Sequence, residues 1–344
     1  MMDNSTNTAP LVEVEALQMH FSMKGGAFSR RKGVIKAVDG VNFKIYPNET
    51  FGLVGESGCG KTTVGRAILK AIQPTAGKVI YHSKKGEKID FVTMSNKELR
   101  PYRQEVQMIF QDPYSSLSPR MTVQEILEEP LRLAGHTDKK YLYDQAVDMI
   151  QQVGLRSSHL MRYPHAFSGG QRQRIGIARA LITRPRFIVA DEAVSALDVS
   201  VQAQILEILA ELKDKLDLSF LFISHDLSVV KYLCDRVGVM YLGRIVEVAP
   251  TESLFSNPLH PYTEALMHAI PDINEREIRG DILAGEIPDA ANPPSGCAFH
   301  NRCKYAKDKC KTDVPALREF TDTIEGQPIL RQSACHFVEE IYNK

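Results

Sequence analysis

The run from Gly55 to Thr63, GESGCGKTT, constrains this chain more than any other feature. It has the spacing G-x-x-x-x-G-K-[ST], which is typical of phosphate-binding loops. The apolar residues 51–54 precede it, as a buried strand would, and residues 64–72 place apolar side chains at helical spacing. A strand, a glycine-rich loop and a helix in this order give the context that the motif requires, and the alternation of strands and helices farther along the chain predicts a largely parallel β-sheet with crossover helices.

Each part of this run has a chemical use for a bound polyphosphate. Glycines let backbone N–H groups point at phosphates, and the following helix N-terminus adds partial positive charge. Lys61 is expected to reach the β- and γ-phosphates, and the Thr62 hydroxyl to ligate Mg²⁺. The alternative is a glycine-rich turn with a solvated lysine, which the flanking residues disfavour. The predicted phosphate-binding residues are Gly55, Ser57, Gly58, Cys59, Gly60, Lys61, Thr62 and Thr63.

Composition narrows the class of partner. The 344 residues are 43% hydrophobic and 24% charged, with a formal net charge of zero. A neutral chain gives no support for nucleic acid as the main partner. No apolar run is long enough to span a membrane, and residues 1–10 are polar and lack the apolar core of a signal peptide. We therefore expect a cytoplasmic protein.

The pattern along the chain predicts two domains. Strand-like segments occupy residues 11–21, then 34–38 and 41–45 around an Asp39-Gly40 turn. Helical periodicity dominates residues 112–166, with breaks expected at Pro130 and Gly135, and strands and helices alternate again from residue 187. Composition becomes proline-rich and polar after Pro250. The predicted domains are 11–250, with a helical subdomain at about 112–166, and a loop-rich extension at 251–344.

Two further motifs suit phosphate chemistry. Residues 187–191 form an apolar strand that ends in Asp191, a candidate Mg²⁺ ligand, and Glu192 follows as a candidate acceptor of a proton from water. Ser168-Gly169-Gly170-Gln171 precedes a helix and could form a second phosphate-binding nest. Taken alone, that serine is an ordinary helix N-cap.

Together these residues resemble the ATP-binding subunits of ABC transporters. The run Ser168 to Gln171 resembles the signature motif of that family, and residues 195–198 resemble its D-loop. Gln111 falls on the Q-loop, His225 on the switch histidine and Phe21 near the aromatic residue that stacks on adenine. Two departures, Phe167 before the signature serine and Ala193 after the carboxylate pair, remove no reacting group.

The resemblance implies an α/β P-loop ATPase with a mainly parallel core sheet, an antiparallel β subdomain, a helical subdomain and a loop-rich C-terminal extension. In the family two subunits meet head to tail around each ATP. Glu192, His225 and Gln111 would be catalytic, and Thr62, Gln111 and Asp191 would hold Mg²⁺. The signature residues Ser168, Gly169, Gly170 and Gln171 would contact the ATP of the partner.

A narrower resemblance points to the oligopeptide/dipeptide importers, and among them to the F-type of two paired ATPase subunits. It rests on residues 111–121, 194–204 and 257–263. It implies a second related ATPase chain, two membrane permeases and, indirectly, an extracytoplasmic substrate-binding protein, at the cytoplasmic face of the membrane. Nickel, glutathione or sugar remain open as cargo. The sequence lacks the second nucleotide domain or long coiled coil of soluble ABC ATPases of translation and repair, and its intact reacting groups disfavour a catalytically dead regulatory module.

Four cysteines, Cys297, Cys303, Cys310 and Cys335, crowd the last fifty residues. Their spacing differs from the paired C-x-x-C of zinc ribbons. Four thiolates on a loop-rich segment could hold a [4Fe–4S] cluster, as the similar tail of some peptide-importer subunits does, and zinc or unliganded thiols remain alternatives. We expect a structural role. Because the phosphate loop is remote in sequence, loss of one cysteine is expected to leave ATP binding little changed.

Overall fold

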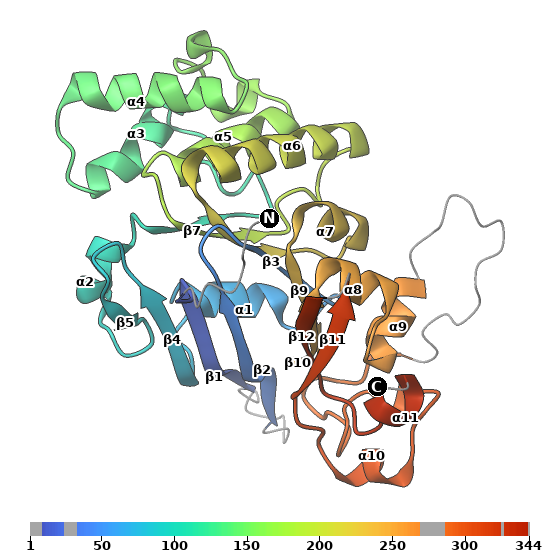
Figure 1. The fold of residues 1–344 in the computed structure, drawn as a ribbon. Coiled ribbons are helices and arrows are strands. Elements are labelled where there is room, and N and C mark those ends of the chain that lie inside the picture. The colour runs from blue at the N-terminus through green and yellow to red at the C-terminus, as the bar shows by residue number, and fades with distance from the viewer. Residues whose placement is uncertain (1–8, 24–32, 269–285, 325–326, 343–344) are drawn as a thin grey trace, which may run out of the picture. The chain divides into compact units, whose positions relative to one another are not determined.

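The computed structural model describes residues 9–23, 33–268, 286–324 and 327–342, and most of the polar N-terminal stretch lies outside these ranges (Figure 1). The strands are β1 (Val12–Met23), β2 (Gly33–Ile45), β3 (Thr50–Val54), β4 (Ala76–His82), β5 (Lys88–Asp90), β6 (Val106–Ile109), β7 (Phe187–Asp191), β8 (Ser219–Ile223), β9 (Arg236–Tyr241), β10 (Arg244–Pro250), β11 (Arg318–Ile324) and β12 (Gln327–Ser333). The α-helices are α1 (Lys61–Ile68), α2 (Asn96–Leu99), α3 (Val123–Leu133), α4 (Lys139–Gln152), α5 (Gly169–Leu181), α6 (Val199–Leu216), α7 (Leu227–Leu233), α8 (Thr251–Ser256), α9 (Pro261–His268), α10 (Asp308–Thr312) and α11 (Val338–Tyr342). Short 3-10 turns are η1 (Arg100–Tyr102), η2 (Ser157–His159), η3 (Pro164–Ala166) and η4 (His300–Arg302).

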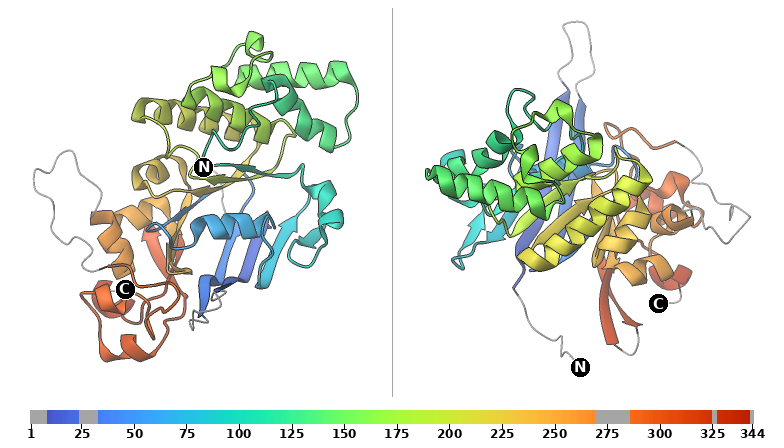
Figure 2. Two further views of the ribbon diagram at one scale, coloured as in Figure 1. Left: turned by 180° about the vertical axis from the view of Figure 1, so that it is seen from behind. Right: turned by 90° about the horizontal axis from the view of Figure 1, so that it is seen from above.

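The chain forms two compact units, and the first comprises residues 1–12, 44–50 and 80–223. Its strands β6, β7 and β8 are parallel neighbours, with Asp191 of β7 opposite Ile223 of β8. Every residue of β7 and β8 is buried, as expected for parallel strands covered on both faces. Helices α3 to α6 pack against one another, and α5 contacts β6 (Figure 2).

The second unit comprises residues 13–43, 51–79 and 224–344. Here β3 pairs in parallel with β9, and β10, β12 and β11 follow as antiparallel neighbours. The fully buried β3 leads straight into the phosphate loop and α1, so the loop lies at the carboxyl end of a buried strand that pairs in parallel with β9. The predicted α/β class, with parallel core strands and a set of antiparallel ones, is confirmed.

Two local predictions were wrong. The turn expected at Asp39-Gly40 does not split the chain, since β2 runs unbroken from Gly33 to Ile45 while Gly40 takes a φ of 80° within it. Glycine bears this left-handed conformation without steric cost, so the strand bends and continues. Pro130 does not end a helix either, because it lies inside α3, where buried Ile126, Leu127 and Leu131 hold the turn together. Gly135, at φ 101°, does follow the end of that helix.

The C-terminal segment contains a hairpin that sequence patterns missed. Strands β11 and β12 pair over seven residues each, and β12 adds to β10 with Glu247 opposite Ser333. The predicted boundary near residue 250, and the 112–166 subdomain that encloses α3 and α4, stay predictions. Among the described residues no helix is both long and apolar enough to cross a membrane.

Candidate nucleotide-binding and hydrolysis site

The phosphate loop in the second unit depends on glycine at two positions. Gly55 and Gly60 take φ values of 150° and 110°. A Cβ added to Gly55 would lie 2.1 Å from the Met240 carbonyl oxygen, and one added to Gly60 would lie 2.1 Å from that of Ala37. Backbone from two neighbouring segments therefore fills the space that any other side chain would need, and this packing fixes the shape of the loop.

Lys61 begins α1 and is buried, with 5% of its surface exposed. Its Nζ donates to the carbonyl oxygens of Gly55 at 2.8 Å and Glu56 at 3.1 Å. The ammonium group is thus held over the loop, where phosphate oxygens could replace those carbonyls. The neighbouring Cys59 is also buried, so its side chain packs within the loop, and burial raises the pKa of its thiol.

The remaining predicted loop residues lie more openly. Ser57 and Gly58 are exposed, and Thr62 and Thr63 are partly exposed on the first turn of α1. Phe21, the predicted adenine-stacking residue, lies on β1 with 42% of its surface exposed. An exposed aromatic ring in the same unit as the phosphate loop is free of the core and suits a flat ligand.

His225 is exposed between the end of β8 and the start of α7. The backbone on either side of it is fixed, because the Ser224 N–H donates to the Leu53 carbonyl oxygen at 3.3 Å and the Asp226 carboxylate caps α7. Its strand-end position is therefore the one predicted for it.

In the first unit the structure brings two predicted catalytic residues together. Gln111, just after β6, donates from Nε2 to Oε2 of Glu192 at 2.7 Å. Asp191 is buried at the end of β7, and Glu192 follows with a left-handed φ of 46°. The parallel pairing of β6 with β7 explains the contact, because the carboxyl ends of neighbouring parallel strands share one edge.

The signature residues lie at the N-terminus of α5, also in the first unit. Ser168 caps the helix, and Ser168 and Gln171 form a reciprocal capping box. The cap uses the serine oxygen as an acceptor, so its hydroxyl hydrogen can still donate to another group. Gly170 has a spatial reason to be glycine, because a Cβ there would lie 2.4 Å from a Val201 methyl group of α6. Ser168 is exposed and Gly169 partly exposed, as a contact with a partner subunit would require.

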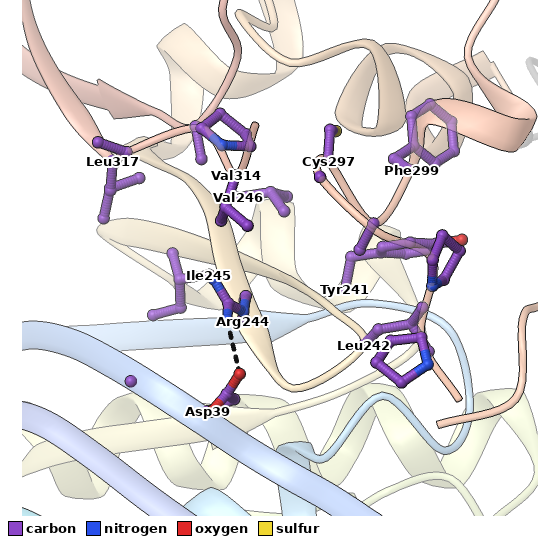
Figure 3. Close-up of a pocket in the computed structure, with 18 of the residues that line it drawn as sticks. Asp39, Tyr241, Leu242, Arg244, Ile245, Val246, Cys297, Phe299, Val314 and Leu317 are labelled. Atoms are coloured by element: carbon purple, nitrogen blue, oxygen red, sulfur yellow. Dashed lines mark hydrogen bonds and ion pairs between the residues drawn. The ribbon is translucent and has the colours of Figure 1, made fainter. Parts of the chain in front are cut away.

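A hydrogen-bond network connects β2 and the turn between β9 and β10 with the phosphate loop. The Asp39 carboxylate accepts from Arg244 at 2.6 Å and from His20 at 3.2 Å. The Asp39 N–H donates to the Gly243 carbonyl, and the Gly243 N–H donates to that of Cys59 in the loop. Burial opposes the charge on Asp39, but Arg244, Lys36 and His20 together outweigh it and lower the pKa of the carboxyl. This pair lies at the edge of a cavity of about 440 Å³, whose other walls include Tyr241, Cys297 and Phe299 (Figure 3).

The four tail cysteines line one small cavity in the second unit. Burial and then the neighbouring thiols raise the pKa of Cys297 to about 12, and burial raises that of Cys303 to about 11. Across the described ranges, no three His, Cys, Asp or Glu side chains are placed to hold one metal ion. The iron–sulfur prediction therefore gains no support from a metal-binding group, although the cysteines do converge.

Sequence reasoning missed three residues that support the loop: Glu56, Tyr262 and Arg302. The Tyr262 hydroxyl accepts a hydrogen bond from the Glu56 N–H at 2.9 Å, and Arg302 forms an ion pair with the Glu56 carboxylate. Glu56 stands at a variable position of the motif and Tyr262 within the already noted run 257–263, but no local pattern links either residue to Arg302.

Comparison with known proteins agrees with this geometry. Residues 38–195 match the family described as ABC transporter, and residues 246–310 match the oligopeptide/dipeptide transporter, C-terminal region. The oligopeptide transport ATP-binding protein AppF of Bacillus subtilis is 46% identical over 319 residues, covering 92% of this chain and 95% of AppF. A Brucella ovis ATP-binding protein, provisionally assigned to peptide import, is 52% identical over 312 residues, covering 90% of this chain and 94% of that protein.

Among solved structures, the dimeric ATP-binding cassette MJ0796, bound to ADP and Pi in a post-hydrolysis state, matches with a TM-score of 0.61 and 26% identity. The match covers 70% of this chain and 98% of that cassette. Fold, phosphate loop and relatives define the chain as an ABC transporter ATPase, a class that uses ATP with Mg²⁺ and works with membrane permeases. Within that class, the chain belongs to the ATP-binding proteins of the oligopeptide/dipeptide transporter family.

Proposed function

We propose that this chain hydrolyses ATP to power import of oligopeptides or dipeptides through a membrane ABC transporter. The hydrogen bond between Gln111 and Glu192 carries the catalytic part of this proposal, because it joins two residues of separate motifs at one edge of the β6–β7 pair. The peptide cargo is supported by relatives at 46% and 52% identity whose names refer to oligopeptide transport and peptide import.

In this proposal the phosphate loop binds the triphosphate through backbone N–H groups, and Lys61 neutralises the β- and γ-phosphates. Thr62, Gln111 and Asp191 hold Mg²⁺. Glu192 accepts a proton from the attacking water, and Gln111 orients its carboxylate before reaction. His225 stabilises charge on the γ-phosphate. Phe21 stacks on adenine, and Ser168, Gly169, Gly170 and Gln171 contact the nucleotide held by a partner ATPase.

The decisive experiment replaces the proposed base, Glu192, by glutamine, which has the same shape but cannot accept a proton. Glu192→Gln should bind ATP with unchanged affinity and lose turnover by about 100-fold or more, because an amide cannot accept the proton. Lys61→Ala should weaken ATP binding itself. Glu211→Gln, on the exposed face of α6, is the matched control and should leave both quantities unchanged. Undiminished hydrolysis by Glu192→Gln would refute the assigned base.

The assembly belongs to the same proposal. The chain is the F-type member of two paired ATPase subunits, which the identity with AppF supports. It docks with its partner ATPase on two permeases at the cytoplasmic face of the membrane, and an extracytoplasmic binding protein delivers the cargo. Co-purification from detergent-solubilised membranes, followed by mass analysis, tests this composition. A binding protein that retains nickel, glutathione or a sugar instead of peptide would contradict the cargo.

We also propose that Cys297, Cys303, Cys310 and Cys335 hold a [4Fe–4S] cluster, which would act as a cross-link of the tail. The proposal is supported by the four thiols around one cavity, a donor set that suits such a cluster better than a single hard cation. Binding would also remove the protons from the thiols of Cys297, Cys303 and Cys335, whose pKa values burial raises. Protein purified without oxygen should contain about four iron and four sulfide per chain. Zinc, or no metal, in that preparation would refute it.

A further inference from the structure

We propose that Arg302, in the cysteine-bearing tail, is a positioning residue for the phosphate loop and sets its affinity for ATP by neutralising Glu56. The inference rests on the proposed placement of ATP at residues 55–63. It adds a determinant of nucleotide affinity that lies outside the motifs of the ATPase.

The contact is a two-pronged ion pair. Arg302 Nη1 lies 2.8 Å from Oε2 of Glu56, and Nη2 lies 3.0 Å from Oε1. Only 4% of the Arg302 side chain and 20% of the Glu56 side chain are exposed. The hydrogen bonds to Glu56 raise the pKa of the guanidinium further above its usual range, so the charge is permanent. Paired donors on a carboxylate, shielded from water, make this contact stronger than an ordinary surface pair.

The same loop residue is held at two other points. Its backbone N–H donates to the Tyr262 hydroxyl at 2.9 Å, and its carbonyl oxygen accepts from Lys61 Nζ at 3.1 Å. Glu56 is therefore fixed by the tail on one side and by the phosphate-binding lysine on the other. A shift of Glu56 would move the carbonyl on which Lys61 rests.

Aromatic rings fix the guanidinium in turn. Arg302 lies 5.9 Å from the ring centre of Tyr241 and 6.0 Å from that of Phe299, within range of cation–π attraction. Tyr241 packs on Tyr262 with centroids 4.6 Å apart, and Phe299 meets Tyr241 edge to face. Figure 3 shows Tyr241 and Phe299 close together on the cavity wall. Arg302 thus has one well-packed position, directed at the loop.

Electrostatics gives the pair a consequence for ATP. A carboxylate in a loop that receives a polyphosphate repels the ligand unless a cation neutralises it. With Arg302 in place, Glu56 adds no net charge beside the phosphates. Without Arg302, the carboxylate of Glu56 keeps an uncompensated negative charge in the loop that receives the phosphates.

The position of Arg302 links this effect to the tail. Arg302 ends η4, and the next residue, Cys303, lines the cysteine cavity with Cys297. Any change that loosens this cavity acts on the segment that holds Glu56. This pair bridges the separation in sequence on which the expected independence of tail and phosphate loop was based, so the proposal predicts that the two are coupled.

The test is a double-mutant comparison on the full chain, with the Kd for ATP measured by calorimetry. Arg302→Gln should raise the Kd about five- to tenfold, since it exposes the charge of Glu56 to the phosphates. Glu56→Gln in the same chain removes that charge and should return the Kd to within about twofold of wild type. Arg318→Gln is the matched control, because Arg318 forms a similar two-pronged pair with Glu339 elsewhere in the tail. Its Kd should equal that of wild type.

A purely structural role predicts a different pattern. If Arg302 only holds the tail together, the double variant will bind ATP as weakly as Arg302→Gln, and the proposal is wrong. An unchanged Kd in Arg302→Gln, beside a weakened Lys61→Ala, also overturns it and leaves the ATP site standing. Arg302→Lys keeps the positive charge but cannot donate two parallel hydrogen bonds to Glu56, so its Kd should be intermediate. A Kd equal to that of Arg302→Gln would contradict charge neutralisation. If Lys61→Ala binds ATP like wild type, the loop is not the site and both proposals fail.

Discussion

Glu192, the proposed catalytic base, has an unfavourable backbone conformation. Its φ of 46° is in the left-handed region, which costs a residue with a Cβ about 1 kcal/mol. The surrounding contacts hold it there, because its N–H donates to the Ile223 carbonyl and its own carbonyl accepts from both the N–H and the hydroxyl of Ser195. The turn directs the carboxylate away from the strand and toward Gln111. Backbone strain here is thus the cost of orienting one side chain.

Asp39 gives a pH prediction at the same scale. Its folded-state pKa is lowered, so its contribution to stability is fully present above the unfolded-state pKa near 4 and is lost as the pH falls through the lower folded value. Asp39→Asn should destabilise the protein by about 1–3 kcal/mol at pH 7, through loss of the charged bond to Arg244. The difference in stability between the wild type and this variant should become smaller below about pH 4. Urea unfolding midpoints of the wild type and of Asp39→Asn, recorded from pH 7 to 3, measure this difference in stability. A difference that does not change with pH would contradict the prediction.

At the scale of elements, the β11–β12 hairpin is held by a buried ion pair. Arg331 of β12 donates to the Glu247 carboxylate of β10 at 3.0 Å, and both side chains are fully buried. Glu247 also accepts from the N–H groups of Leu259 and His260, which connects the hairpin with the segment before α9. A buried pair of this kind is weak support for stability but is very sensitive to loss of one partner. It specifies where β12 docks.

Arg331→Met should therefore destabilise the docking of the β11–β12 hairpin by about 3–5 kcal/mol, since it leaves the Glu247 carboxylate buried without its counter-charge. Hydrogen exchange of the β12 amides measures this locally, and protection should fall at least about 100-fold. Replacing Glu247 by Gln as well should restore part of the protection. Arg318→Gln on β11, whose pair is solvent-exposed, should change protection very little. Equal effects of Arg318→Gln and Arg331→Met would contradict this interpretation.

At the scale of the whole molecule, the proposed contact of the exposed Ser168 with the nucleotide of a partner ATPase would make the isolated chain an incomplete catalyst. We predict that the isolated chain is mostly monomeric with Mg-ATP and hydrolyses slowly, because each ATP lacks the signature residues of a partner. Adding the related ATPase chain and the permeases should raise turnover at least about tenfold. Sedimentation velocity and ATPase assays check both points. A stable homodimer with full activity would contradict the pairing with a different ATPase chain.

How much of the structure could be predicted depended on how far apart in the sequence the contacting residues lie. The phosphate loop, α1 and β7 follow from residues adjacent in the chain, so motif and periodicity sufficed. Gln111 and Glu192 were predicted as individual site residues, but their 2.7 Å contact depends on how β6 and β7 pair. Arg302 was missed because its partner lies 246 residues away, and no local pattern encodes that distance. The continuous β2 was missed because Gly40 can either end a strand or bend it.

The same separation has a consequence for how the protein is made. Glu56 leaves the ribosome early, but its partners Tyr262 and Arg302 follow much later. At about 5–20 residues per second, the 246 residues between Glu56 and Arg302 take roughly 12–50 s to translate. During that time the nascent loop lacks its ion pair with Arg302, and a truncated product ending before residue 302 would never form this pair. Under the proposed role of Arg302, tight ATP binding is therefore possible only after residue 302 has been synthesised and has folded onto the loop.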